Sequence, residues 1–332
     1  MIKGRLSFTI NLSLFLSSIF VPCTGYPADF RFVAWGDTKS GTPSLQSMSA
    51  EVVAKNPAFT VFAGDLVEAG FSTAPMNTWK TALNGGTNNG LFEKTFALRG
   101  NHDAANLSGW QGFFDFPAVA TRAGATNFNA YSTDVVYSFD YGNSHFIVLD
   151  VTGGEIDMLP AAQITWMASD LTSAETRGLT HAFIHLHAPP YCVSSSHCPY
   201  LTTTGDEAAA AFWTAINNHP IVTAIFAGHE HLLTRTLLDS TRVRDLTRTV
   251  EQFVSGAAGV VSVDPSNCDY TNRWSWCESV DGYATVDVSG TTATVTFFQG
   301  GGASPLSTYV ITKPIGDNTA KSPNPPANIR VQ

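Results

Sequence analysis

The side chains of this chain that could bind metal ions follow apolar segments with the pattern of strands. Residues 59–63 (Phe-Thr-Val-Phe-Ala) are rich in β-branched and aromatic types, which indicates a buried strand, and they lead directly into Gly64 and Asp65. Open α/β sheets bind ligands beyond the carboxyl ends of their strands, so Asp65 is expected in a ligand crevice. Other polar residues follow apolar segments in the same way: Asp37, Asn101, His102, His187, His229 and His231. These oxygen and nitrogen donors can hold two metal ions, bridged by Asp65.

The elements that position these residues are expected from hydrophobic periodicity and turn signals. Strands are predicted over residues 30–35, 59–63, 95–98, 135–140, 145–150, 180–186, 221–227, 233–238, 251–254, 283–288 and 292–298, and helices over residues 42–55, 75–83, 160–171 and 205–219. The initial strand–helix–strand unit predicts a sheet that begins parallel, with a right-handed crossover. Residues 104–132 are predicted to be irregular.

One domain is predicted over residues 28–312, preceded by a secretory signal over residues 1–25. The signal has two basic residues before an apolar run, and Cys23 and Gly25 are small residues suited to cleavage after Gly25. The run is too short and too rich in serine for a good membrane span, and no other stretch is long enough. We therefore predict a secreted or periplasmic protein, with cleavage before Cys23 as a lipoprotein as the alternative. The Pro-rich residues 313–332 are predicted to be a tail or a linker to a further C-terminal module.

The charge and the cysteine count limit the functions of the exported chain. Removing residues 1–25 takes away two basic and no acidic residues, so the formal charge changes from −9 to −11. Such a charge excludes nucleic-acid binding through the general surface. Four cysteines remain, and an even count in an exported chain indicates two disulfides. Among the three pairings we predict the sequence-local one, Cys192–Cys198 and Cys268–Cys277.

The order of the motifs resembles the calcineurin-like metallophosphoesterases over about residues 30–298. The motifs are Gly-Asp, Gly-Asp, Gly-Asn-His-Asp, His-x-Pro and Gly-His-x-His, each after a predicted strand. The resemblance implies a four-layer α/β/β/α sandwich with two mixed β-sheets, and a dinuclear centre of Fe, Zn or Mn. It implies that the first ion is bound by Asp37, Asp65 and His231, and the second by Asp65, Asn101, His187 and His229. His185 is an alternative to His187, but the His-x-Pro pattern begins at His187.

The resemblance also implies an activity, the hydrolysis of a small phosphate ester by a metal-bound hydroxide. His102 would face the phosphate and assist the leaving group, and Asp103 would orient the His102 ring by accepting its other N–H. Two metal ions would leave the site with a net positive charge that attracts phosphate. The alternatives are a phosphodiesterase acting on nucleotides or phospholipid headgroups, and a non-catalytic binding module that keeps its metals.

The chain departs from the family pattern at two positions. Lys39 stands where many members have the His of an Asp-x-His motif, and Lys cannot replace His as a neutral ligand. Glu68 stands where purple acid phosphatases have a tyrosine ligand, so no tyrosinate–iron colour is expected. Glu68 either binds the first ion or caps a nearby helix or loop, and both interpretations stay open. Lys39 and Arg235 are candidate substrate-binding residues. Arg235 matches an arginine of the purple acid phosphatase branch.

Overall fold

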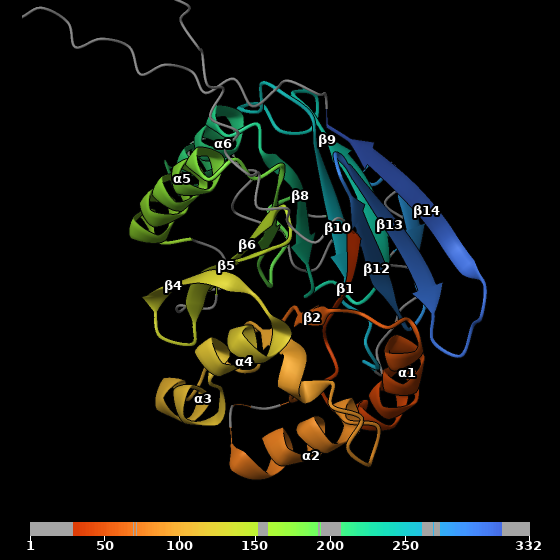
Figure 1. Ribbon diagram of the computed structural model, residues 1–332. Helices are drawn as coiled ribbons and strands as arrows, with labels where there is room; N and C mark the ends of the chain where they lie inside the picture. Colours follow the sequence, from red (N-terminus) through yellow and green to blue (C-terminus); the bar gives the residue numbers. More distant parts are fainter. Residues whose placement is uncertain are drawn as a thin grey trace, which may run out of the picture.

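Two mixed β-sheets pack face to face in this protein, and helices lie against their outer faces (Figure 1). The computed structural model describes residues 29–68, 70, 72–151, 159–191, 193, 207–260, 268 and 273–313. The arrangement is the predicted α/β/β/α sandwich, so the predicted fold class is confirmed.

The first sheet has six strands. Their order across the sheet is β14 (Pro305–Thr312), β13 (Thr292–Gln299), β12 (Gly282–Ser289), β1 (Asp29–Trp35), β2 (Phe59–Phe62) and β3 (Thr95–Ala97). Strands β1, β2 and β3 run parallel, as predicted, whereas β12, β13 and β14 form an antiparallel meander attached to β1. Parallel strands end at the same edge of a sheet, so the segments that follow β1, β2 and β3 meet there.

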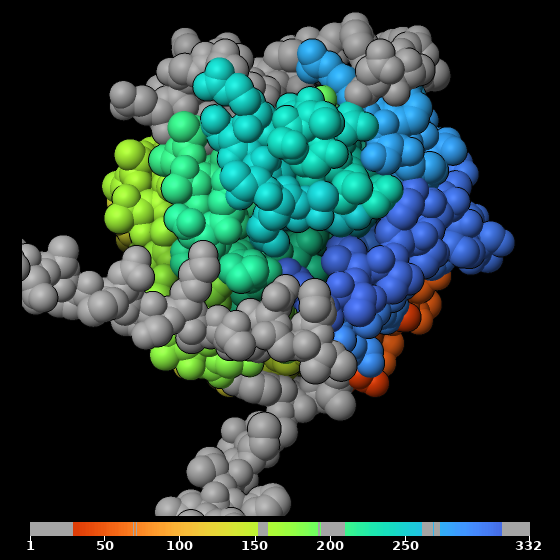
Figure 2. Space-filling model, turned by 90° about the horizontal axis from the view of Figure 1, so that it is seen from above, coloured from red at the N-terminus to blue at the C-terminus, as the bar shows by residue number. Residues whose placement is uncertain are grey.

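The second sheet has eight strands. Their order is β11 (Trp276–Glu278), β9 (Leu233–Leu238), β10 (Val250–Ser255), β8 (Val222–Ala227), β7 (His181–His185), β6 (Ser144–Val148), β5 (Val136–Tyr141) and β4 (Thr126–Ser132). Strands β6, β7, β8 and β10 are parallel, so their carboxyl ends also share one edge. Seen from above, residues 207–260, coloured green to teal, lie between the yellow-green α5 region and the blue C-terminal strands (Figure 2).

The helices are short, and most were predicted. They are α1 (Thr42–Ala54), α2 (Thr73–Leu83), α3 (Leu107–Phe113), α4 (Phe116–Ala123), α5 (Ala161–Thr176) and α6 (Glu207–Asn218), with a 3₁₀ turn at Phe92–Lys94. Helices α1 and α2 lie beside the first sheet, and α5 and α6 lie beside the second (Figure 1). Among the described residues, no helix combines the length and the apolar character that crossing a membrane requires.

Aromatic side chains fill the space between the sheets. Phe32 of β1 lies 5.3 Å from Phe183 of β7 and 5.9 Å from Phe226 of β8, measured between ring centroids. Phe59 of β2 lies 5.0 Å from Phe146 of β6, nearly perpendicular to it. Burial of rings this large stabilises the contact between the sheets, and edge-on geometry adds to it. The packed core therefore fixes the position of the ends of one sheet relative to those of the other.

The prediction of irregular structure over residues 104–132 is wrong, because this segment forms α3, α4 and β4. Asn106 and Asp115 begin the two helices, and their side chains accept the backbone N–H groups of Gly109 and Ala118. The helices are too short to show a full apolar period. Strands β11 and β14 were also missed, since β11 has three residues and β14 is a half-exposed edge strand.

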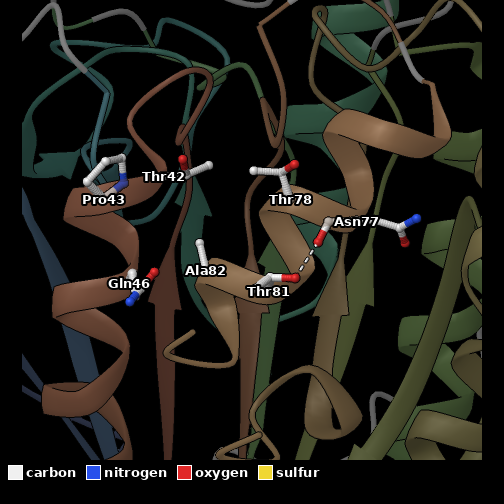
Figure 3. Close-up of a pocket in the computed structure, with 7 residues that line it drawn as sticks. All are labelled: Thr42, Pro43, Gln46, Asn77, Thr78, Thr81 and Ala82. Atoms are coloured by element: carbon white, nitrogen blue, oxygen red, sulfur yellow. Dashed lines mark hydrogen bonds between the residues drawn. The ribbon is translucent and has the colours of Figure 1, made fainter. Parts of the chain in front are cut away.

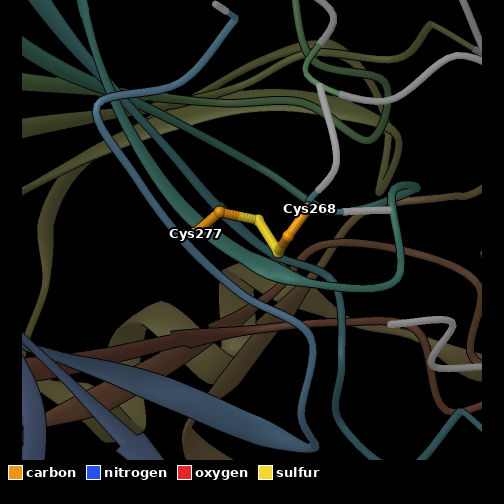
Figure 4. Close-up of a disulfide and its surroundings, with 2 residues drawn as sticks. All are labelled: Cys268 and Cys277. Atoms are coloured by element: carbon orange, nitrogen blue, oxygen red, sulfur yellow. A yellow bond between two sulfur atoms is a disulfide. The ribbon is translucent and has the colours of Figure 1, made fainter. Parts of the chain in front are cut away.

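A disulfide joins Cys268 to Cys277 in β11, the pairing expected from the sequence (Figure 4). Their Cα atoms are 5.8 Å apart, and the closed loop anchors the short strand β11 to the segment before it. The second predicted pair, Cys192–Cys198, lies outside the described residues. The predicted signal over residues 1–25 lies outside them too, and so does nearly all of the Pro-rich tail.

Candidate metal centre

The structure brings the predicted metal ligands together at the carboxyl ends of five strands. Each of the ligands comes from the segment that follows a strand: Asp37 after β1, Asp65 after β2, Asn101 after β3, His187 after β7, and His229 and His231 after β8. Backbone hydrogen bonds between neighbouring segments hold the arrangement, since the N–H of Asp37 donates to Gly64 and that of Gly228 donates to His187. His185, the alternative to His187, is buried between aromatic rings of the core instead.

Four ligand atoms converge at what we name the second metal position. Nε2 of His187 lies 3.0 Å from Oδ1 of Asn101 and 3.3 Å from Oδ1 of Asp65. Nδ1 of His229 lies 3.1 Å from both Oδ1 of Asn101 and Nε2 of His187. Donors at tetrahedral corners around an ion about 2.1 Å away would stand about 3.4 Å apart. The observed separations are slightly shorter than this value. They are therefore consistent with four ligand atoms arranged around one point.

The protonation of His187 explains why this point suits a cation. Its Nδ1 donates to the carbonyl oxygen of Ala63 at 2.7 Å, so Nε2 carries a lone pair. Burial lowers the pKa of His187, and this keeps the ring neutral. Nε2 thus faces two oxygen acceptors, Asn101 Oδ1 and Asp65 Oδ1. Acceptors that face one another at this distance repel unless a cation lies among them, so the donor set fits a metal ion.

The first metal position has three ligands and is looser. Ligand atoms of Asp37, Asp65 and His231 all lie within 4.8 Å of one another. Nε2 of His231 is 3.8 Å from Oδ1 of Asp37. Oδ2 of Asp65, which faces this side, accepts no hydrogen bond from a described residue.

The carboxylates of Asp37 and Asp65 repel each other when no cation lies between them. Burial and then the charge of Asp65 raise the pKa of Asp37 well above its ordinary value. Burial also acts to raise the pKa of Asp65, but the backbone N–H of His102 and the charge of Lys39 act against it, and that pKa lies below its usual range. Two divalent ions would relieve the repulsion, so the electrostatics agree with the ligand geometry.

The ligand-bearing segments have unusual backbone conformations. Asp37, Asp65 and His229 have φ values of 63°, 51° and 68°, a region that residues other than glycine rarely adopt. Such strain persists where the surroundings enforce it, and it is concentrated at functional sites. Here the backbone N–H of His229 donates to the Asp37 carboxylate at 2.9 Å, which ties one strained segment to the other.

Glycines precede the predicted metal ligands because the segments that carry these ligands lie in close contact. A Cβ on Gly100 would lie 2.1 Å from Oδ1 of Asp65, and one on Gly64 would lie 2.6 Å from Nδ1 of His187. Gly64 also has φ +84°. A side chain at either position would push a ligand out of place, so the glycines of the motifs are required by the close approach of neighbouring strand ends.

The contacts of His102 correct the predicted role of Asp103. The Nδ1 of His102 contacts the backbone carbonyl oxygen of Glu68, and its Nε2 points toward the site, 3.9 Å from Oδ2 of Asp65. Asp103 is fully buried and accepts backbone N–H groups instead, at 2.9 Å from Gly100 and 3.2 Å from Leu66. Asp103 therefore holds the loops that carry the ligands, whereas Glu68 orients the His102 ring through its carbonyl group.

The buried position of Asp103 affects its protonation. Burial and then the charge of Asp65 raise the pKa of Asp103 to about 7, although backbone N–H groups act against this. The Glu68 carboxylate, in contrast, is exposed and lies outside the ligand group. In this structure the backbone carbonyl of Glu68 holds His102, and the predicted ligand role of its carboxylate stays a prediction.

The two candidate substrate-binding cations have different surroundings. Nζ of Lys39 lies 3.5 Å from Oδ2 of Asp65, inside the site. Arg235 lies on β9, where its Nε donates to Glu251 at 2.9 Å and its guanidinium stacks on Tyr309. These contacts hold the guanidinium of Arg235 beside Glu251 and Tyr309, and its predicted role in substrate binding stays a prediction.

Sequence reasoning missed a buried ion pair beside the site. Arg99 stands directly before Gly100 and pairs with Asp150, and both side chains are more than nine-tenths buried. The signal in the sequence was an arginine between an apolar strand and a Gly-Asn motif. The pair ties the segment that follows β3 to the segment that follows β6.

A separate cavity of about 460 Å³ lies between α1 and α2 (Figure 3). Its lining is neutral and consists of Thr42, Pro43, Gln46, Asn77, Thr78, Thr81 and Ala82. None of these residues belongs to the ligand set, and the cavity has no charge with which to bind a phosphate. The metal centre is therefore the site where phosphate chemistry fits best.

Comparison with known proteins agrees with this geometry. The model of the calcineurin-like phosphoesterases matches residues 30–233. No curated protein matches the chain. A purple acid phosphatase from yellow lupin (Lupinus luteus) seeds is similar in structure, with a TM-score of 0.64, 13% identity, and coverage of 92% of this chain and 57% of that one. This chain thus spans little more than half of the lupin protein.

Two further structures resemble the chain over most of their own length. A dimetal phosphatase from Danio rerio has a TM-score of 0.56 and 13% identity, covering 85% of this chain and 98% of that one. GAP50, the anchor in the inner membrane complex of Plasmodium, has a TM-score of 0.55 and 14% identity, covering 86% and 89%. At these identities the likeness shows a shared fold.

Proposed function

The chain belongs to the calcineurin-like phosphoesterase family, a family of phosphoric ester hydrolases, and we propose that it hydrolyses small phosphate esters at a centre of two metal ions. The observation that carries the proposal is the convergence of Asn101, His187, His229 and Asp65 from four separate strand ends on one point. Asp37 and His231 would complete the first position around the shared Asp65.

Bound metal ions would supply positive charge for the phosphoryl oxygens and lower the pKa of water, so that a nucleophile is available near neutral pH. The donors are nitrogen and oxygen without cysteine, a set that suits Zn, Mn or Fe. The family implies divalent ions, and the choice among the three metals is part of the test.

His102 is the residue we assign to proton transfer. The Glu68 carbonyl holds its Nδ1, so Nε2 is the atom that points toward the site. A protonated His102 can donate from Nε2 to the leaving oxygen, a step that contributes about 10²- to 10⁴-fold in comparable enzymes. Asp103 acts indirectly, because its carboxylate holds the backbone around Gly100 and Leu66.

We further propose that the reaction takes place outside the cytoplasm. The support is the signal-like pattern of residues 1–25 together with the Cys268–Cys277 disulfide, because disulfides persist mainly in oxidising compartments. Sequencing the amino terminus of the exported protein tests this proposal, and cleavage after Gly25 is the expected result.

The activity is tested with the purified exported protein, aryl phosphate monoesters and diesters, and added Mn²⁺, Zn²⁺ or Fe²⁺. We expect metal-dependent turnover that falls about 10²- to 10⁴-fold in His102→Ala. The matched control is His219→Ala, because His219 lies away from the site and contacts Glu175.

The outcomes separate the candidate functions. Preference for diesters would favour the phosphodiesterase alternative. Two bound ions without turnover of any ester would contradict hydrolysis and favour a non-catalytic binding module.

A further inference from the structure

Lys39 is built into the metal centre rather than lying free on the surface. Its side chain is 14% exposed, and its Nζ lies 3.5 Å from Oδ2 of Asp65. Its backbone N–H donates to the carbonyl oxygen of Asp65 at 3.0 Å, and its φ is 50°, a strained value for lysine. The backbone therefore holds the start of the Lys39 side chain beside Asp65, and the ion pair places its ammonium group in the site.

The two oxygens of Asp65 face different metal positions. Oδ1 faces the second position, 3.3 Å from Nε2 of His187, and it also accepts the backbone N–H of His102 at 3.0 Å. Oδ2 faces the first position, where its nearest cation is the Lys39 ammonium. Oδ2 is thus the oxygen of Asp65 beside the first position, and the Lys39 ammonium would oppose any cation that approaches it there.

The two positions also differ in their ligands. The second has four donors, with separations of 3.0–3.3 Å between neighbouring donor atoms. The first has three, with 3.8 Å between Nε2 of His231 and Oδ1 of Asp37, and an ammonium group lies beside them. Fewer ligands weaken binding, and a fixed positive charge a few ångströms from a divalent cation repels it strongly in a partly buried site.

We propose that Lys39 makes the two metal positions unequal: the second holds its ion tightly, and the first binds its ion weakly and exchanges it with the medium. The proposal rests on the proposed function only in that both positions take metal. The occupancy of the first position would then follow the concentration of free metal.

The test counts bound metal without using turnover. The purified protein is stripped with a chelator, loaded with Mn²⁺, dialysed against metal-free buffer, and analysed for Mn²⁺ per chain. A Mn²⁺ titration followed by electron paramagnetic resonance, which detects the free ion, then gives both dissociation constants. For the native chain we expect one retained ion and a second that binds at least tenfold more weakly.

Three variants at one position isolate the effect of Lys39. Lys39→His removes the charge and supplies a ring nitrogen, so the weak site should tighten at least tenfold and two ions should survive dialysis. Lys39→Met removes only the charge and should tighten the weak site by a smaller factor. Lys39→Arg keeps the charge and should behave like the native chain. The dissociation constant of the tightly bound ion is measured in the same titration. It reports whether each variant is folded around the second position.

Equal affinities in the native chain would overturn the proposal, as would a dissociation constant of the weak site that Lys39→Met leaves unchanged. These outcomes are distinct from failure of the proposed function. Unequal sites in a protein that hydrolyses no ester would sustain the role of Lys39 and reject hydrolysis. Ester turnover with two equally tight ions would sustain hydrolysis and reject the role of Lys39.

Discussion

Two buried clusters of aspartate and histidine in this molecule use the same residue types in opposite ways. Outside the metal centre, the ring of His145 lies between Asp140 and Asp170, with its nitrogens 2.7 and 2.9 Å from the two carboxylates, and Arg177 pairs with Asp140. We call these four residues the ion-pair cluster. Each donor there meets an acceptor. In the metal centre, acceptors face acceptors, so residue type alone does not mark a metal site, whereas the direction of the lone pairs does.

The backbone separates the two clusters as well. Asp140, His145 and Asp170 lie within β5, β6 and α5, and none of them has a positive φ. The metal ligands follow strands, and Asp37 and Asp65 have positive φ. Regular elements hold a salt bridge with unstrained backbone, whereas convergence from several strand ends requires strained turns.

The largest expected effect tests whether the metal centre is a ligand site at all. His187→Ala removes the imidazole that meets both Asn101 and Asp65, so catalysis should fall about 10³-fold or more, because metal ions supply several kcal/mol of transition-state stabilisation. Metal content and kcat are the measurements. His185→Ala, two residues earlier on the same segment, is the matched control, and its metal content should stay native. Loss of metal in the control alone would reverse the ligand assignment.

Removing a histidine from the ion-pair cluster should have the opposite consequence. His145→Ala removes the imidazole between the two buried carboxylates of Asp140 and Asp170, and breaking a buried ion pair in this way costs about 3–5 kcal/mol. The free energy of unfolding, measured in urea at fixed metal concentration, should fall by that amount. The kcat of the molecules that remain folded should not change. A loss of kcat at native stability would contradict the proposed difference between the ion-pair cluster and the metal centre.

These two clusters also show what could be predicted from the sequence. The convergence of the predicted ligands was predictable because each stands at the end of an apolar segment, and parallel strands bring their ends together. The contact between His102 and the Glu68 carbonyl was not predictable, because a backbone acceptor leaves no pattern in residue types. Arg235 resembled a family arginine, but the pairing of β9 with β10 brings it beside Glu251, and that is a long-range consequence of the fold.

The short elements were beyond prediction for a different reason. Helices α3 and α4 have seven and eight residues, fewer than the period of an amphipathic helix needs to become visible. Asn106 and Asp115 are capping residues in them, yet the same residue types begin turns just as often. The predicted loop was therefore a reasonable interpretation that tertiary packing overrode.

The pH dependence of stability sharpens the comparison further. Burial lowers the pKa of His145, but hydrogen bonds to Asp140 and Asp170 outweigh it, so the folded pKa is raised above the ordinary value of 6.5. The unfolded chain then binds fewer protons than the folded one above pH 6.5. The stabilisation by His145 should be complete below pH 6.5 and be lost as the pH rises through the folded pKa. Urea unfolding of the native chain and of His145→Gln from pH 6 to 9 measures it.

The difference in unfolding free energy between the two proteins should shrink as the pH rises. Each unit by which the folded pKa exceeds 6.5 corresponds to about 1.4 kcal/mol. Both proteins keep the metal centre, so its own titration cancels in the difference. A difference that is constant over this range would mean that His145 is not charged in the folded protein.

The smallest effect concerns His185, which belongs to neither cluster. Its ring is fully buried, stacks on Phe226 and has no hydrogen-bond partner among the described residues. Burial lowers its pKa to about 3. In the unfolded chain it takes up a proton near pH 6.5, so stability is present above pH 6.5 and is lost as the pH falls below it, by about 2 kcal/mol at pH 5.

His185→Leu removes this titration and keeps an apolar side chain between the sheets. The variant should lose about 2 kcal/mol less stability than the native chain between pH 8 and pH 5, measured by urea unfolding at the same metal concentration. An identical loss in both proteins would place the acid sensitivity elsewhere, for instance at His181, whose pKa burial lowers to about 4. A lower pH thus stabilises the fold through His145 of the ion-pair cluster and destabilises it through His185 of the core.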